Sequence, residues 1–248
     1  MSDLKLGSLF SGIGGFELAG SLVGITPVWC SDIEPFVVSV ESLRFPNCKQ
    51  LGSVTDINGA EIEPVDIITF GSPCQDLSVA GKQAGIHEGQ RSNLFFEAVR
   101  IIKEMRSATN GVYPRFAVWE NVPGAFSSNK GSDFQAVIEA LCRVKAPDAS
   151  VPMPKGNRWL PAGCVVGNAY SVAWRILNAQ YYGVPQRRKR IYLVADFGSE
   201  RAGEVQFIGE SVPWHPAQSE EAAKRITAYV EGSPAGSDPD HGDDDGGD

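Results

Sequence analysis

The sequence has few of the residues that build disulfide frameworks or metal sites. Its five cysteines are odd in number and widely spaced, no Cys-x-x-Cys pair occurs, and its three histidines are scattered. Neither a disulfide framework nor a structural zinc site is therefore expected. Each cysteine is then either a small core residue or a single reactive thiol. The five are Cys30, Cys48, Cys74, Cys142 and Cys164.

Long hydrophobic runs are also missing. No apolar stretch approaches the roughly 18–20 residues that cross a bilayer. Residues 1–5 lack the basic start and apolar stretch of a signal peptide. These absences predict a cytosolic protein without a membrane partner. The length of 248 residues and the 42% hydrophobic content fit one large domain with a substantial core.

Acidic residues outnumber basic ones, which gives the chain a formal net charge of −8. Six of the aspartates lie in residues 232–248, which contain no Lys or Arg, and the rest of the chain is close to neutral. Residues 187–190 form one dense basic run, Arg-Arg-Lys-Arg. The charge therefore neither supports nor excludes binding to nucleic acid.

Strand and helix patterns alternate along the chain, which favours an α/β fold with a doubly wound, mostly parallel sheet. The last strand should return antiparallel to its neighbour. We expect one domain over residues 1–231, with an irregular Pro-, Gly- and Ala-rich insertion at 145–168 and a disordered acidic tail at 232–248. The expected strands are 5–10, 27–33, 65–70, 116–119, 170–178 and 190–197, and the expected helices are 16–23, 35–43, 93–105 and 133–144.

A glycine-rich turn follows the first expected strand. Residues 10–16 read Phe-Ser-Gly-Ile-Gly-Gly-Phe, and glycines let a ligand approach the backbone closely. Asp32 follows about 20 residues later, at the end of the next strand, where a carboxylate can hold ribose hydroxyls. The pair fits a nucleoside-bearing ligand. Asp32 as a carboxylate at a helix start is an equally simple interpretation, because Pro35 follows closely.

Cys74 lies in a polar loop, Gly-Ser-Pro-Cys-Gln at residues 71–75, just after a buried strand. A lone cysteine is more often inert core than catalyst. In an α/β sheet, however, this loop falls at the edge where reactive loops gather, and there a thiol can be exposed and activated. The apolar surroundings of Cys30 and Cys142 suit packing instead.

Two further polar groups follow strands. Glu120, in the segment Trp-Glu-Asn-Val at 119–122, could donate a proton from a partly apolar cleft. The segment Gln-Arg-Arg-Lys-Arg at 186–190 is either a solvated basic loop or a phosphate-contacting patch.

These four segments, in this order, resemble the cytosine-C5 DNA methyltransferase family. The segments 77–83 (Leu-Ser-Val-Ala-Gly-Lys-Gln) and 182–185 (Tyr-Gly-Val-Pro) extend the resemblance, which covers most of residues 4–197. It implies a Rossmann-like methyltransferase sheet, S-adenosylmethionine as methyl donor, S-adenosylhomocysteine as product, and double-stranded DNA as partner. The target base must be flipped out of the helix for such chemistry.

The resemblance also implies roles for individual residues. Cys74 would be the nucleophile that adds to C6 of cytosine, Glu120 would engage N3 and the exocyclic amine, and Arg188 with Arg190 would hold the O2 side. The cofactor site implied by the resemblance comprises Phe10, Gly12, Gly14, Asp32, Ile33, Ser53, Gly71, Pro73 and Leu94. No metal is implied.

Two departures from the family pattern leave alternatives open. Ser53 stands where members usually carry an aspartate that contacts adenine, which predicts weaker cofactor binding. The variable recognition domain and the Gly-Asn segment that follow the Arg-rich loop in the family have no counterpart in the 50 or so residues after Tyr192. The chain is then an active catalytic domain, a subunit whose recognition part comes from a second polypeptide, a non-catalytic binding protein, or an RNA-directed relative.

Overall fold

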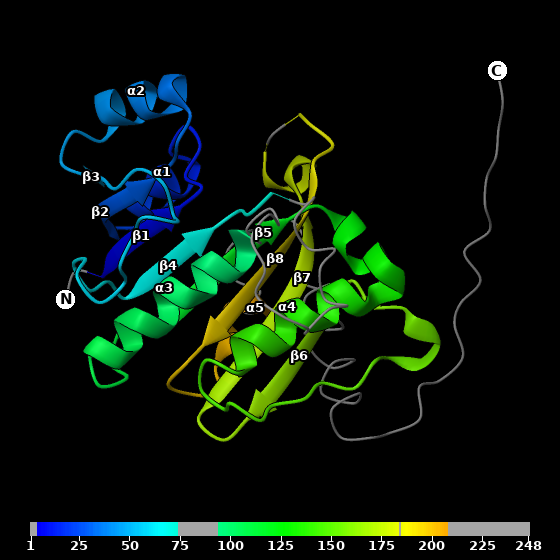
Figure 1. The fold of residues 1–248 in the computed structure, drawn as a ribbon. Coiled ribbons are helices and arrows are strands. Elements are labelled where there is room, and N and C mark those ends of the chain that lie inside the picture. The colour runs from blue at the N-terminus through cyan, green and yellow to red at the C-terminus, as the bar shows by residue number, and fades with distance from the viewer. Residues whose placement is uncertain (1–3, 74–93, 184, 208–248) are drawn as a thin grey trace, which may run out of the picture.

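The computed structural model describes residues 4–73, 94–183 and 185–207. Within these residues the chain folds around one eight-stranded sheet with the strand order β3-β2-β1-β4-β5-β8-β7-β6 (Figure 1). Helices lie against the sheet, so that side chains from both layers form the core. The predicted tail at 232–248 lies outside the described residues.

Five strands form the parallel half of the sheet, and each pairs with its neighbour in parallel register. Their carboxyl ends therefore lie at one edge, where α/β folds place their binding loops. Four of these strands match expected ones, whereas the short β3 was not predicted. The five are β1 (Lys5–Leu9), β2 (Thr26–Ser31), β3 (Lys49–Gln50), β4 (Ile67–Phe70) and β5 (Phe116–Asn121).

The other half of the sheet is antiparallel. Strand β8 (Lys189–Asp196) lies between β5 and β7 (Tyr170–Asn178) and runs opposite to both. The expected antiparallel return strand is thus confirmed, and the loop between β7 and β8 falls at the edge that carries the other loops. The expectation of an irregular segment over 145–168 was wrong for its last part, because β6 (Ala162–Gly167) pairs along β7 as the outermost strand. Val165 and Val166 there suit an edge strand, a signal that the surrounding Pro and Gly residues obscured.

Helices α3 and α4 cross in front of the sheet in the view of Figure 1. Together with that face they bury Phe95, Trp119 and Phe134, all fully buried, with ring centroids of Phe95 and Trp119 6.0 Å apart. A smaller cluster around Ala173 and Val194 packs against α5 on the opposite face. The helices are α1 (Gly15–Leu22), α2 (Pro35–Arg44), α3 (Leu94–Ala108), α4 (Ser132–Cys142) and the unpredicted α5 (Ala202–Phe207).

None of the described helices is long and apolar enough to cross a membrane. Nor do the described residues contain a group of three or more His, Cys, Asp or Glu side chains that could hold a metal ion.

Candidate active site

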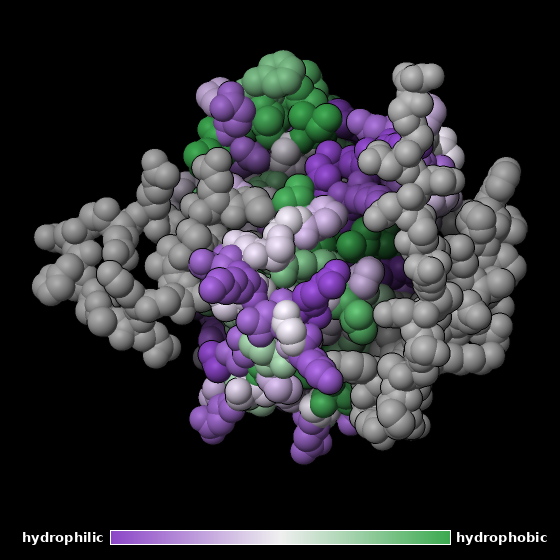
Figure 2. Space-filling model, turned by 90° about the vertical axis from the view of Figure 1, so that its right-hand side faces the viewer, coloured by the Kyte–Doolittle hydropathy of each residue, from purple (hydrophilic) through white to green (hydrophobic). Residues whose placement is uncertain are grey.

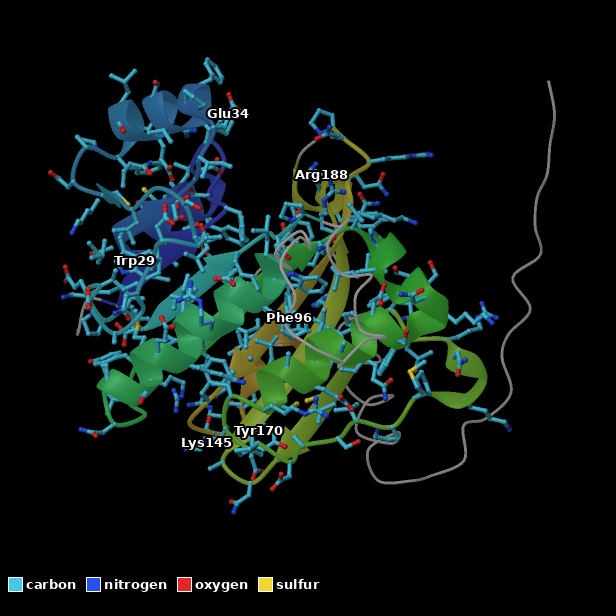
Figure 3. The ribbon with its side chains drawn as sticks, viewed as in Figure 1. Trp29, Glu34, Phe96, Lys145, Tyr170 and Arg188 are labelled. Atoms are coloured by element: carbon cyan, nitrogen blue, oxygen red, sulfur yellow. The ribbon has the colours of Figure 1, made fainter. Side chains whose placement is uncertain are left out.

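Most of the predicted site residues that the structure describes follow or end strands of the parallel half at one edge of the sheet. Arg188 and Arg190 lie at the start of the antiparallel β8, and Leu94 begins α3. Figure 3 labels two markers of this edge, Glu34 at the start of α2 and Arg188 on the loop between β7 and β8. The parallel register of β1, β2, β4 and β5 brings their loops together, although the sequence separates these loops by tens of residues. Cys74 itself, with residues 75–93, lies outside the described residues.

The turn after β1 adopts a backbone that favours glycine. Gly12 and Gly14 have φ values of 59° and 83°, and Phe10 has 54°, which is uncommon for a residue with a Cβ. A Cβ on Gly14 would lie 2.4 Å from Cε2 of Phe45, whereas a Cβ on Gly12 would meet nothing within 4 Å. The turn is thus packed on the side of α2 and open at Gly12, where a ligand can reach the backbone.

Asp32 ties this turn to the end of β2. Its Oδ2 accepts a hydrogen bond from the Gly12 amide (3.0 Å), and its Oδ1 accepts from the amides of Ile33 (2.8 Å) and Glu34 (3.0 Å). Glu34 is the N-cap residue of α2. Asp32 therefore has the helix-start role that its position before Pro35 indicated, and it also joins the glycine turn to that helix. A carboxylate has about four acceptor sites, so Asp32 retains capacity for ribose hydroxyls.

Other residues of the expected cofactor site lie on the same side. Ile33 follows Asp32 with 75% of its surface exposed, which leaves an apolar face available to a flat ring. Ser53 follows Gly52, whose carbonyl accepts a hydrogen bond from the Ser31 hydroxyl (2.6 Å) at the end of β2. The Ser53 hydroxyl lies 2.7 Å from that of Thr55, so its hydrogen-bonding capacity is partly used within its own turn.

The loop that leads to Cys74 is held by residues of β5. Trp119 donates a hydrogen bond from its indole nitrogen to the Ser72 hydroxyl (3.3 Å), and the Asn121 side chain donates to the Ser72 carbonyl (3.2 Å). Ser72 and Asn121 are buried. Sequence reasoning assigned neither of them a role. Asn121 lies inside the motif that contains Glu120. A side-chain amide at the end of a strand was the feature of the sequence that could have indicated a role in holding the neighbouring loop.

Glu120 lies between that loop and the basic loop. Its Oε1 is 2.9 Å from Nε of Arg190 and 3.6 Å from Nη2 of Arg188. On its other side, a Cβ added to Gly71 would lie 3.4 Å from Glu120 Oε2. One carboxylate thus faces two guanidinium groups and the backbone just before Cys74. Register also places Glu120 opposite Tyr192, whose phenol pKa burial raises.

The shape of the basic loop depends on Asn178, the last residue of β7. Its Oδ1 accepts hydrogen bonds from the amides of Arg188 (3.2 Å) and Gln180 (3.4 Å), and the Ala179 amide donates to the Arg188 carbonyl (3.0 Å). Asn178 is nearly buried, with 7% of its surface exposed. It therefore fixes the backbone that carries Arg188, a role that sequence reasoning missed.

The remaining cysteines are poor nucleophiles. Cys30 and Cys142 are buried, as predicted, and so is Cys48. Burial raises the pKa of Cys142 to about 12 and that of Cys164 to about 11. A hydrogen bond with Cys48, together with burial, raises the pKa of Cys30 as well. The thiols of Cys30, Cys142 and Cys164 therefore stay protonated at neutral pH, whereas the reactive species of a thiol is the thiolate.

Comparison with solved structures defines the class of fold. The structure matches the crystal structure of the Dnmt2 methyltransferase of S. pombe with a TM-score of 0.53, at 19% sequence identity, covering 78% of this chain and 50% of that one. A likeness at this identity shows the fold alone, which is that of a Rossmann-like methyltransferase.

Sequence comparison defines the family. Residues 4–144 and 165–236 match the model of the family described as C-5 cytosine-specific DNA methylase. The chain belongs to this family, which confirms the resemblance seen in its motifs.

Two curated relatives illustrate how much of the family the chain represents. It is 31% identical over 206 residues to the type II methyltransferase M.NgoBV of Neisseria gonorrhoeae, covering 81% of this chain and 43% of the relative. It is 34% identical over 218 residues to a protein of Escherichia phage P1 named DNA N-6-adenine-methyltransferase, covering 79% of this chain and 29% of the relative. The chain thus spans less than half the length of either.

Proposed function

We propose that this chain transfers a methyl group from S-adenosylmethionine to C5 of a cytosine in DNA. The observation that carries the proposal is the position of Glu120. It pairs with Arg190 at 2.9 Å and faces the backbone at Gly71, three residues before Cys74. The same edge of the sheet carries the open glycine turn and Asp32. A nucleophile loop, a carboxyl, paired guanidinium groups and a nucleoside site are the parts that this reaction requires.

The reaction begins with the pyrimidine ring. The Cys74 thiolate adds to C6, which breaks the aromatic system and makes C5 nucleophilic. Glu120 binds N3 and the exocyclic amine, while Arg188 and Arg190 hold the O2 side as negative charge develops on the ring. C5 then takes the methyl group, its proton is lost to a base, and elimination of Cys74 restores the ring. The base must leave the stacked duplex to reach these groups.

The methyl donor has a site that the described residues fit. S-adenosylmethionine supplies an electrophilic methyl group on its sulfonium. Asp32 has spare acceptor capacity for ribose hydroxyls, and the backbone is open at Gly12 and at Gly52, where an added Cβ would meet nothing within 4 Å. The exposed Ile33 offers an apolar face to adenine. Phe10, Gly14, Ser53, Gly71, Pro73 and Leu94 complete the proposed pocket.

Trapping the covalent intermediate tests this function. Incubation with a duplex that contains 5-fluorocytosine and with S-adenosylmethionine should yield a protein–DNA adduct, because fluorine at C5 cannot leave as a proton does. Mass spectrometry should place the adduct on Cys74. Cys74→Ser should abolish both adduct and methylation, while Cys164→Ser, which alters a protonated thiol outside the site, should abolish neither.

The same experiment separates the alternatives. An adduct that forms only after a second polypeptide is added would assign target recognition to that partner. Adduct formation on tRNA but not on duplex DNA would identify an RNA-directed enzyme. Methyl transfer to adenine N6, suggested only by the name of the phage P1 relative, or methylation that persists in Cys74→Ser would refute the proposed mechanism. Cofactor binding without any adduct would indicate a non-catalytic protein.

A further inference from the structure

A pocket of about 360 Å³ opens between two turns, one following β5 and one at residues 155–159. The first turn comprises the 3₁₀ helices η2 (Pro123–Phe126) and η3 (Ser128–Gly131). We call this pocket the insertion pocket. Its lining residues are Phe126, Ser127, Lys130, Gly156, Asn157, Arg158 and Trp159.

One wall of the insertion pocket lies outside the segments shared with the family. The family match stops at residue 144 and resumes at residue 165, so that the turn at 155–159 belongs to a stretch that the family model leaves unmatched. That stretch also contributes the start of the outer strand β6. The chemistry of the pocket is therefore a property of this chain rather than of the family's shared machinery.

The insertion pocket is basic. Lys130 and Arg158 line it, and Lys155 lies beside it at the start of the same turn. All three are exposed, no carboxylate lines the pocket, and no ion pair is found for any of them among the described residues. The nearby Asp133 is buried and accepts hydrogen bonds from Ser128 and Asn129. The cations are thus available to an anion from outside.

The two turns hold each other in place. The Trp159 indole nitrogen donates a hydrogen bond to the Gly131 carbonyl (2.8 Å), and a Cβ on Gly131 would lie 2.9 Å from the Asn157 carbonyl oxygen. The Trp159 ring packs edge-on against Phe134 (5.3 Å) and Trp174 (5.8 Å). The basic side chains therefore project from a fixed platform, which lowers the entropy lost when they bind a ligand.

The insertion pocket lies near the proposed active site. The segment η2 begins two residues after Asn121 and contacts β8, the strand that carries Arg190 (Figure 1). Lys130 lies ten positions after Glu120 in the chain, and such a length spans at most about 35 Å, roughly one turn of B-DNA. Figure 2 faces the side on which the turn at 155–159 lies in Figure 1, and hydrophilic residues are interspersed with apolar ones in the middle of that face.

We propose that the insertion pocket binds the phosphate backbone of the DNA beside the target base, through Lys130, Arg158 and Lys155. This inference rests on the proposed function, since it assigns the same substrate a second contact. Phosphate oxygens are the ligands that clustered Lys and Arg side chains recognise in nucleic acid. Such contacts position the duplex and carry no sequence information, so the pocket would strengthen binding to all sequences alike.

The test measures DNA binding by the full chain as a function of salt. Each phosphate contact contributes about 0.9 to the slope of log K against log salt, so two contacts change affinity about 12-fold between 50 and 200 mM salt. Raising the salt from 50 to 200 mM should therefore weaken DNA binding by the Lys130→Ala/Arg158→Ala variant about 12-fold less than it weakens binding by the wild type. The matched control Lys49→Ala/Lys103→Ala removes two exposed cations of β3 and α3 and should keep the wild-type slope.

The outcomes separate this inference from the proposed function. An unchanged salt slope in the double variant, or a wild-type chain that does not bind DNA, would overturn the inference. If the Cys74 adduct nevertheless forms, the proposed function stands, and only the phosphate contact at the insertion pocket is overturned. A reduced salt slope in a protein that forms no adduct, either alone or with a second polypeptide, would support phosphate binding by the insertion pocket and refute the proposed activity. Tighter binding of duplex RNA through the same residues would assign the surface to RNA and overturn its assignment to DNA.

Discussion

The Glu120 carboxylate lies closer to Arg190 than to Arg188, at 2.9 Å from Nε of the first and 3.6 Å from Nη2 of the second. The Arg190 side chain is also less exposed, at 22% against 50%. Arg190 extends from β8 next to the partner strand β5, whereas Arg188 lies on the loop before β8. The sequence motif does not distinguish the two arginines, but in the structure Arg190 makes the closer and less exposed ion pair with Glu120.

Replacing Glu120 by glutamine should lower the rate of methylation about 100-fold or more. The amide keeps the size of the side chain but cannot supply a proton to the ring or balance the two guanidinium groups. Single-turnover methylation assays give the rate, and calorimetry should show unchanged binding of S-adenosylmethionine. Glu204→Gln, at an exposed carboxylate of α5, is the control and should leave the rate unchanged. A Glu120→Gln rate within threefold of the wild type would remove Glu120 from the chemistry.

Arg190→Ala should lower kcat/KM for DNA at least tenfold more than Arg188→Ala. The closer and more buried guanidinium loses less of its interaction to solvent, and its removal leaves Glu120 without its nearest partner. Steady-state kinetics of the two variants at equal salt measures the difference. Equal effects, or a larger loss for Arg188→Ala, would show that the substrate rearranges this pair when it binds.

Gly14→Ala should destabilise the chain by about 1–3 kcal/mol, because the αL backbone disfavours a Cβ and the new methyl group meets the Phe45 ring. The neighbouring Gly15→Ala is the matched control. Gly15 begins α1 with an ordinary backbone, and an added Cβ there would meet nothing within 4 Å. Urea denaturation should therefore separate the two variants, and similar midpoints would mean that the turn relaxes without cost.

The buried Glu17 makes stability depend on pH. Burial, with a smaller contribution from the nearby Glu41, raises the pKa of Glu17 from 4.5 to about 7, and neither carboxylate oxygen of Glu17 has a hydrogen-bond partner among the described residues. The folded chain thus favours the protonated form. Between pH 4.5 and 7 the unfolded chain ionises first, so Glu17 costs stability increasingly as pH rises through this window.

Glu17→Gln should therefore stabilise the chain more at pH 8 than at pH 5, by on the order of 3 kcal/mol. Denaturant unfolding at the two pH values measures the difference. Glu63→Gln, at an exposed residue, provides the control for general effects of charge. A gain that is the same at both pH values would show that Glu17 is not the group that titrates.

Much of the fold follows from local patterns. The apolar run before Gly71 predicted β4, and the spacing of Leu94, Val99 and Ile102 predicted α3. The failures have physical reasons. Strand β3 has only two residues, too short to show a periodic pattern. Strand β6 lies among Pro and Gly residues, and its pairing with β7 rather than its own composition makes it a strand.

The sequence by itself determined the family of this protein and, through the family, the chemistry that we propose for the site. The order of the glycine turn, Cys74, Glu120 and the Arg-rich loop identifies the family, because reactivity depends on which functional groups are present. Only the tertiary structure decided how those groups meet. Arg190 approaches Glu120 more closely than Arg188 does, because β8 pairs antiparallel to β5 and carries Arg190 along that strand. Asn178 and Asn121 shape the loops through hydrogen bonds to distant backbone atoms. Such contacts depend on strand register, which no local pattern encodes.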